Sequence, residues 1–110
     1  MGAYYDLTLY SHAIQSFMII GSITDKALRR FAETGNAKGV MQPERITDML
    51  AFIVSASVFA DLSTPPNFGL HRLKGNRADV WAMTVTRNYR LTFTQIDDQT
   101  IGNLNLEDYH

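Results

Sequence analysis

An alternating pattern between residues 79 and 93 constrains the fold of this chain more than any other feature. Apolar side chains occupy the odd positions on both sides of a polar break at Arg87-Asn88: Trp81, Met83, Val85, Tyr89, Leu91 and Phe93. Because successive side chains of a strand point to opposite faces of a sheet, the two runs predict neighbouring strands with one apolar face. The polar break predicts the tight turn of a hairpin between them.

Two amphipathic helices are predicted ahead of this hairpin. The first covers about residues 25–34, with an N-cap at Thr24 or Asp25. Gly35 ends it, because glycine adopts the left-handed backbone of a helix C-terminus at little cost. The second begins at Pro43, since proline suits a first helical turn, and is predicted to run to about residue 59.

Further strands are predicted at residues 18–23, 70–74 and 101–106. The element order is then one strand, two helices and four strands. This order indicates an α+β domain in which two N-terminal helices pack on one face of a small antiparallel sheet of four to five strands.

The 110 residues suit one domain. We assign it to residues 18–110 and treat 1–17 as an N-terminal extension. The extension lacks the basic start and long apolar core of a signal peptide. Its alternation at residues 5–10 indicates a short strand, and Ser11 is a candidate N-cap for a helical turn up to Phe17.

Composition excludes several kinds of site. The absence of cysteine rules out disulfides, thiolate metal sites and thiol nucleophiles, and it fits a cytoplasmic protein. No apolar run reaches the roughly 18 residues of a membrane span. The sequence has no glycine-rich phosphate loop, and His12, His71 and His110 lack metal-ligand spacing. We therefore expect no metal and no cofactor.

Charge is concentrated although the net charge is only −1. Residues 70–93 hold five of the ten lysines and arginines and one acid, Asp79, whereas residues 94–110 hold four acids and no lysine or arginine. The basic residues are Arg72, Lys74, Arg77, Arg87 and Arg90. Such a patch favours recognition of one anionic group or strand. A solvated sheet face is the competing interpretation.

Three residues carry the chemistry that this patch suggests. His71 exchanges protons near neutral pH, and Lys74 can hold a phosphate. With His110 as a second acid or base, the set suits metal-free RNA cleavage through attack of the 2′-OH on the adjacent phosphate. Tyr109 offers a stacking surface for a base. The competing interpretations are a surface histidine, a solvated turn and a frayed chain end.

Four motifs resemble the HigB branch of the RelE/ParE toxin superfamily. They are Leu70-His71-Arg72-Leu73-Lys74-Gly75, then Trp81, then Asn88-Tyr89-Arg90-Leu91-Thr92-Phe93, and finally Glu107-Asp108-Tyr109-His110. The branch reads L-H-P-L-K-G, W, N-W-R-(L/I)-T-F and E-D-Y-H at similar spacing. The resemblance spans about residues 18–110.

The resemblance implies a toxin that cleaves translated mRNA in the ribosome without a metal. It implies a helix-turn-helix antitoxin of the HigA type, with operator DNA contacted only through the toxin–antitoxin complex, and no membrane partner. Positions tied to activity in the branch match His71, Lys74, Asp108, Tyr109 and His110. We expect the basic residues Arg72, Arg77, Arg87 and Arg90 to contact RNA or its phosphates.

Two departures from the branch lie at the hairpin. Tyr89 replaces a tryptophan, and Thr86 stands where some members carry an arginine, with Arg87 one residue later. A one-residue offset in a strand reverses the face of a side chain. Two alternatives stay open. One is a non-nucleolytic gyrase inhibitor with the same fold, as in the ParE branch, and the other is a weakly active relative that mainly binds antitoxin and operator as a co-repressor.

Overall fold

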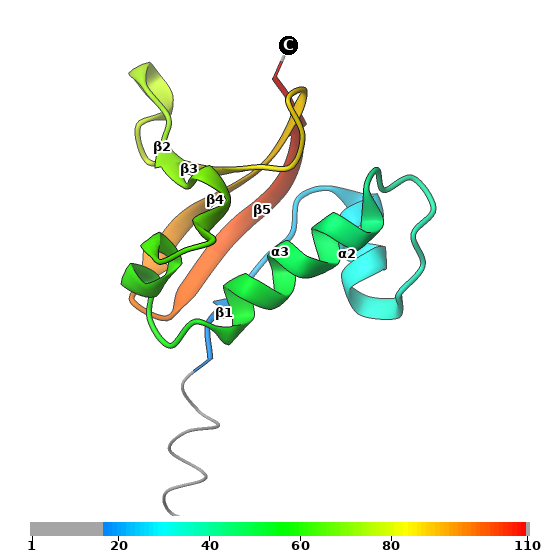
Figure 1. Ribbon diagram of the computed structural model, residues 1–110, viewed down its shortest axis with the longest axis horizontal. Coiled ribbons are helices and arrows are strands. Elements are labelled where there is room, and N and C mark those ends of the chain that lie inside the picture. Colours follow the sequence, from blue (N-terminus) through cyan, green and yellow to red (C-terminus); the bar gives the residue numbers. More distant parts are fainter. Residues whose placement is uncertain (1–16, 110) are drawn as a thin grey trace, which may run out of the picture.

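The computed structural model describes residues 17–109, which form two helices and a five-stranded sheet (Figure 1). The elements are β1 (Ile19–Ile20), α2 (Lys26–Thr34), α3 (Pro43–Ser55), β2 (His71–Arg72), β3 (Val80–Thr84), β4 (Tyr89–Asp97) and β5 (Thr100–Asp108). Short 3-10 turns lie at η1 (Phe59–Ser63), η2 (Asn67–Gly69) and η3 (Gly75–Arg77). The strand and helical turn expected within residues 1–16 lie outside the described residues.

The sheet has the order β1-β5-β4-β3-β2 and is mixed. Strands β2 to β5 are antiparallel to their neighbours, as expected, but β1 runs parallel to β5, with Ile19 opposite Thr100. The expectation of a purely antiparallel sheet was therefore wrong at this edge. Alternation along one strand carries no information on the direction of its partner. The long connection between β1 and β5, which includes both helices, allows the last strand to pair with β1 in the parallel direction.

The hydrophobic core lies between the helices and the apolar face of the hairpin. One buried cluster joins the helices to the hairpin. It contains Leu28 of α2, Ile46, Met49 and Ile53 of α3, and Met83, Val85, Leu91 and Phe93. Figure 1 shows both helices on the same side of the sheet. The predicted odd-numbered face is confirmed, with Trp81 and Tyr89 half-buried at its margins.

The first helix begins and ends where the sequence predicts. The carboxylate of Asp25 accepts a hydrogen bond from the Leu28 amide at 2.8 Å, which satisfies a free donor of the first turn. Gly35 ends α2 with φ of 79°.

Among the described residues, no helix is long and apolar enough to cross a membrane.

The second helix ends at Ser55, earlier than the predicted residue 59. Tertiary contacts take the backbone groups that a longer helix would use. The Ala56 carbonyl accepts from the Met18 amide, and the Phe59 amide donates to the Asp98 carbonyl. The carboxylate of Asp61 accepts from the Ser57 amide at 3.2 Å. These contacts have no periodic signature in the sequence, which explains the error.

Strand lengths also differ from the prediction near the ends of the basic stretch. β2 contains only His71 and Arg72 of the predicted 70–74, because η3 turns the chain away. β5 is longer than the predicted 101–106 and includes Glu107 and Asp108. Hence the acidic pair is part of the sheet.

Candidate functional site

The candidate site is the sheet face that points away from the helices, called here the open face. Residues directly opposite each other in neighbouring antiparallel strands share a face. One cross-strand row on the open face contains His71, Ala82, Thr92 and Asn105, from β2 to β5. The next row contains Thr84, Arg90 and Glu107. The register therefore places His71 and Arg90 on the same face.

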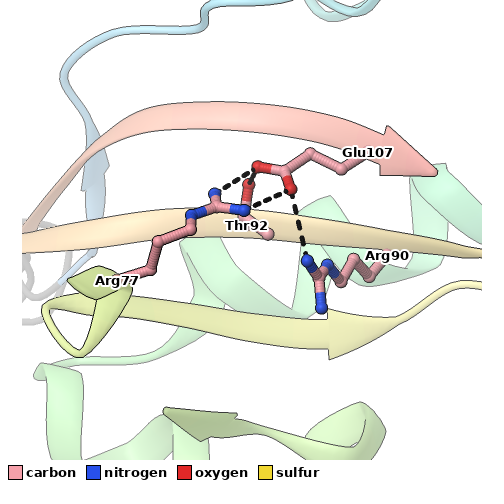
Figure 2. A network of polar contacts seen from close by, with 4 residues as sticks. All are labelled: Arg77, Arg90, Thr92 and Glu107. Carbon is pink, nitrogen blue, oxygen red and sulfur yellow. Dashed lines mark hydrogen bonds and ion pairs between the residues drawn. The ribbon is translucent and has the colours of Figure 1, made fainter. Parts of the chain in front are cut away.

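Glu107 is the centre of a polar network on this face (Figure 2). Arg77 donates two hydrogen bonds to its carboxylate, at 3.0 Å from Nη1 and 2.7 Å from Nη2. The hydroxyl of Thr92 donates to Oε2 at 2.6 Å. Nη2 of Arg90 lies 3.5 Å from Oε1. The network joins η3, β4 and β5 across the open face.

The network fixes the charge of Glu107. Hydrogen bonding by Arg77 is the largest influence, and together with the Thr92 hydroxyl and both arginine charges it outweighs burial and lowers the pKa of Glu107 to about 2. The same contact raises the pKa of Arg77 above its usual value. At neutral pH Glu107 is thus a carboxylate that cannot donate a proton.

Arg77 and Arg90, both predicted to contact phosphate, are thus held by an acid that the prediction did not include as a site residue. The sequence pointed to Glu107 only as the first residue of the Glu107-Asp108-Tyr109-His110 motif. Its position opposite Arg90 follows from the β4–β5 register, which contains irregularities between Thr92 and Thr94 and between Gln95 and Asp97. Sequence alternation alone does not reveal this register.

Arg90 also contacts the end of the described chain. Its guanidinium carbon lies 4.8 Å from the centre of the Tyr109 ring, and its Nε is buried without a hydrogen-bond partner. The Tyr109 amide donates to the Asn88 carbonyl at 2.8 Å. The chain is therefore held beside the β3–β4 turn as far as Tyr109, so a frayed end does not describe it up to this residue. The predicted residue His110 lies outside the described residues.

His71 is exposed on the open face, and its ring is oriented by the backbone. Nδ1 lies 2.8 Å from the Gly69 carbonyl. Since a carbonyl only accepts, Nδ1 carries the proton of this contact and the lone pair of the neutral ring is on Nε2. Gly69 has φ of 69°, and a Cβ there would lie 3.3 Å from the Thr84 hydroxyl. This geometry favours glycine at the residue whose carbonyl orients His71.

The other predicted residues are spread over different parts of this end of the sheet. Lys74 is exposed immediately before η3, and Arg87 is exposed in the β3–β4 turn. Arg72 lies opposite Trp81 on the helix side of β2, with its guanidinium carbon 5.5 Å from the Trp81 ring centre. The structure therefore does not bring Arg72 together with His71. Asp108 is exposed at the end of β5, opposite Tyr89.

Thr86 has a structural role in the β3–β4 turn. The Thr86 hydroxyl accepts hydrogen bonds from the amides of Asn88 and Tyr89, each at 3.2 Å. Thr86 therefore stabilises the turn that presents Arg87.

The open face also contains a hollow of about 260 Å³, which the sequence did not predict. The polar side chains around it include Arg77, Thr92, Thr94, Asn103, Asn105 and Glu107. Within residues 17–109, no three histidine or acidic side chains form a group that suits a metal ion.

Comparisons with known proteins identify the family. Residues 21–110 match the model of a family described as RelE-like toxins of the type II toxin–antitoxin system HigB. The chain is 37% identical over 94 residues to endoribonuclease HigB of Proteus vulgaris, across 84% of this chain and 100% of that protein.

Two solved structures are also similar. A YoeB/ParE toxin from Agrobacterium tumefaciens has a TM-score of 0.47 and 16% identity, covering 84% of this chain and all of that one. The conserved hypothetical protein HP0892 from Helicobacter pylori has a TM-score of 0.40 and 16% identity, covering 84% of this chain and 94% of its own. On the strength of the family match and the full-length relative, this chain belongs to the HigB family of RelE-like toxins of type II toxin–antitoxin systems.

Proposed function

We propose that this toxin inhibits translation by cutting mRNA on the ribosome, as a metal-independent endoribonuclease. The observation that carries the proposal is the orientation of His71. The residue is exposed and its Nδ1 is bound to the Gly69 carbonyl, so Nε2 is the ring nitrogen that remains to accept a proton. The similarity to a protein named endoribonuclease HigB supports this activity.

In this mechanism His71 acts as the general base. Nε2 takes the proton of a ribose 2′-OH, and the 2′ oxygen forms a bond to the adjacent phosphorus. The bond from phosphorus to the 5′ oxygen breaks, and His110 gives a proton to that leaving oxygen. The products are a 2′,3′-cyclic phosphate and a 5′-hydroxyl end. Lys74 stabilises the extra negative charge on the phosphate during the attack.

The end of the chain supplies the remaining groups of the proposed site. Arg90 holds Tyr109 on the open face, where its exposed ring can stack on a base of the mRNA. Asp108 and His110 flank this ring in the sequence. We assign the exposed Arg87 to contact the RNA backbone from the β3–β4 turn. Arg77 and Arg90 contribute positive charge, since Glu107 balances only one of them.

The proposed partners follow from the family. A type II toxin is paired with an antitoxin protein. We propose an antitoxin of the HigA type with a helix-turn-helix domain, and contact with operator DNA only through the complex.

A cleavage assay with translating ribosomes tests the proposed function. The wild-type protein is expected to cut a defined mRNA only when ribosomes translate it, leaving 2′,3′-cyclic phosphate ends. The same mRNA without ribosomes is the control. An intact mRNA on the ribosome, together with inhibition of DNA supercoiling by gyrase, would instead support a ParE-like toxin and contradict the proposal.

A further inference from the structure

The hollow on the open face lies beside an irregularity of β5. Thr92 lies opposite Asn105, but Thr94 lies opposite Gly102, so β5 contains one more residue than β4 between these pairs. Asn103, within this bulge, has φ of 53°, a left-handed conformation that asparagine tolerates better than most residues. Bulges of this kind often re-aim side chains beside functional sites.

Most polar groups around the hollow already have protein partners. The carboxylate of Glu107 accepts hydrogen bonds from Arg77 and Thr92. The hydroxyl of Thr94 donates to the Gly102 carbonyl at 3.4 Å and accepts from the side-chain Nδ2 of Asn103 at 3.2 Å. The half-buried side chain of Asn105 forms no hydrogen bond to any other described residue. A half-buried amide without a protein partner is stabilised by solvent or by a ligand.

The chemistry of the hollow suits a neutral, planar, polar group. The terminal nitrogens of Arg77 are occupied by Glu107, so an anion would have to compete with a carboxylate already in place. The side chain of Asn105 offers a donor and an acceptor side by side, the pattern that pairs with the edge of a nucleobase. Val80 supplies an apolar wall. This combination favours a base over a phosphate.

The hollow also lies on the same sheet face as His71. Asn105 and His71 belong to the same cross-strand row, separated by β3 and β4. Three strand spacings correspond to about 14 Å between their backbones. We propose that the hollow is a nucleobase subsite, in which Asn105 reads one base of the mRNA near the scissile phosphate. The proposal rests on the proposed function, because it adds a specificity site to the same cleavage.

Base preference on the ribosome tests this subsite. Cleavage rates are measured for mRNAs that carry each of the four bases at each position around the cut. For Asn105→Ala, we expect the preference at one position to shrink by about 5- to 150-fold, the range for a lost bidentate base contact. Asn105→Leu keeps side-chain bulk and should show the same loss, whereas Asn105→Gln retains the amide and should recover part of it. Asn36→Ala, in the loop after α2, is the control.

A binding measurement separates this subsite from the proposed function. The Asn105 side-chain amide signals of the full chain are followed by NMR while each of the four nucleoside 5′-monophosphates is added. Selective shifts without ribosomal cleavage would leave the subsite standing and remove the proposed function. Three results for Asn105→Ala would each overturn the subsite. They are cleavage with unchanged base preference, an equal loss of cleavage rate for all four bases, and weakened antitoxin binding as the sole effect. Absence of both cleavage and shifts would overturn both proposals.

Discussion

The guanidinium of Arg77 binds the carboxylate of Glu107 through two hydrogen bonds, at 3.0 and 2.7 Å, across 30 residues of sequence. Arg77 ends η3, the turn that follows His71 and Lys74, and Glu107 lies in the strand that leads to Tyr109. One ion pair thus ties together the two segments to which we assign the catalytic groups. Paired hydrogen bonds between charged groups are stronger and more directional than single neutral ones.

Replacement of Glu107 by glutamine should destabilise the protein. Glu107→Gln removes the negative charge between two arginines and breaks the paired contact, so we expect a loss of about 1–3 kcal/mol in the free energy of unfolding. Urea denaturation measures it. Glu33→Gln, at an exposed position of α2, is the matched control and should change stability by less than about 0.5 kcal/mol. Equal stability of the two variants would show that the network contributes little.

The pH dependence of stability should report the same carboxylate. The pKa of Glu107 is lowered in the folded protein to about 2, from 4.5. A lowered pKa means that its stabilisation is complete above pH 4.5 and is lost as pH falls toward 2. Melting temperatures measured across this range should fall more steeply for the wild type than for Glu107→Gln. Parallel curves would contradict the assignment.

Arg90 should hold Tyr109 through its planar guanidinium. Arg90→Lys keeps the charge but loses the flat group that lies over the ring. A cation–π contact at an exposed site contributes about 0.5–1 kcal/mol, so exchange of the Tyr109 amide hydrogen should accelerate about 2- to 5-fold. Hydrogen exchange followed by NMR measures this change. Arg29→Lys on α2 should leave the Tyr109 amide unaffected, and an unaffected amide in Arg90→Lys would refute the contact.

Gly69 should control the tautomer of His71. In Gly69→Ala the Cβ would lie 3.3 Å from the Thr84 hydroxyl at a φ of 69°, so the carbonyl that binds His71 Nδ1 must shift. NMR of the imidazole nitrogens should show less of the Nδ1-protonated tautomer, together with slower cleavage. Gly75→Ala is the matched control, because its φ is 73° but a Cβ meets no atom within 4 Å. Both variants carry backbone strain, and only the first should alter His71.

The sequence predicted those parts of the fold that depend on local chemistry. Alternation identified the hairpin and the apolar face of Met83 and Leu91. Side-chain chemistry identified the Gly35 stop and limited the N-cap to Thr24 or Asp25, of which Asp25 is the cap. The parallel pairing of β1 and the early end of α3 depend on contacts between distant segments. The local sequence pattern does not indicate these long-range contacts.

The candidate site was predictable as a set of residue types but not as an arrangement. His71 and Arg72 must lie on opposite faces because they are adjacent in a strand, but register decided that His71 lies on the open face and Arg72 on the helix side. The bulge in β5 decided that Asn105 and Glu107 lie beside Thr92 and Arg90. A shift of one residue in either strand would have reversed these faces, and the sequence offers no signal for it.

The proposed cleavage depends most directly on His110, the proposed general acid. The decisive measurement is the single-turnover rate of ribosomal mRNA cleavage by His110→Ala, with His12→Ala, which precedes the family match, as the control. We expect a loss of about 10²- to 10⁴-fold, the usual contribution of general acid catalysis, with an unchanged melting temperature. Cleavage by His110→Ala at the wild-type rate would contradict the proposed mechanism.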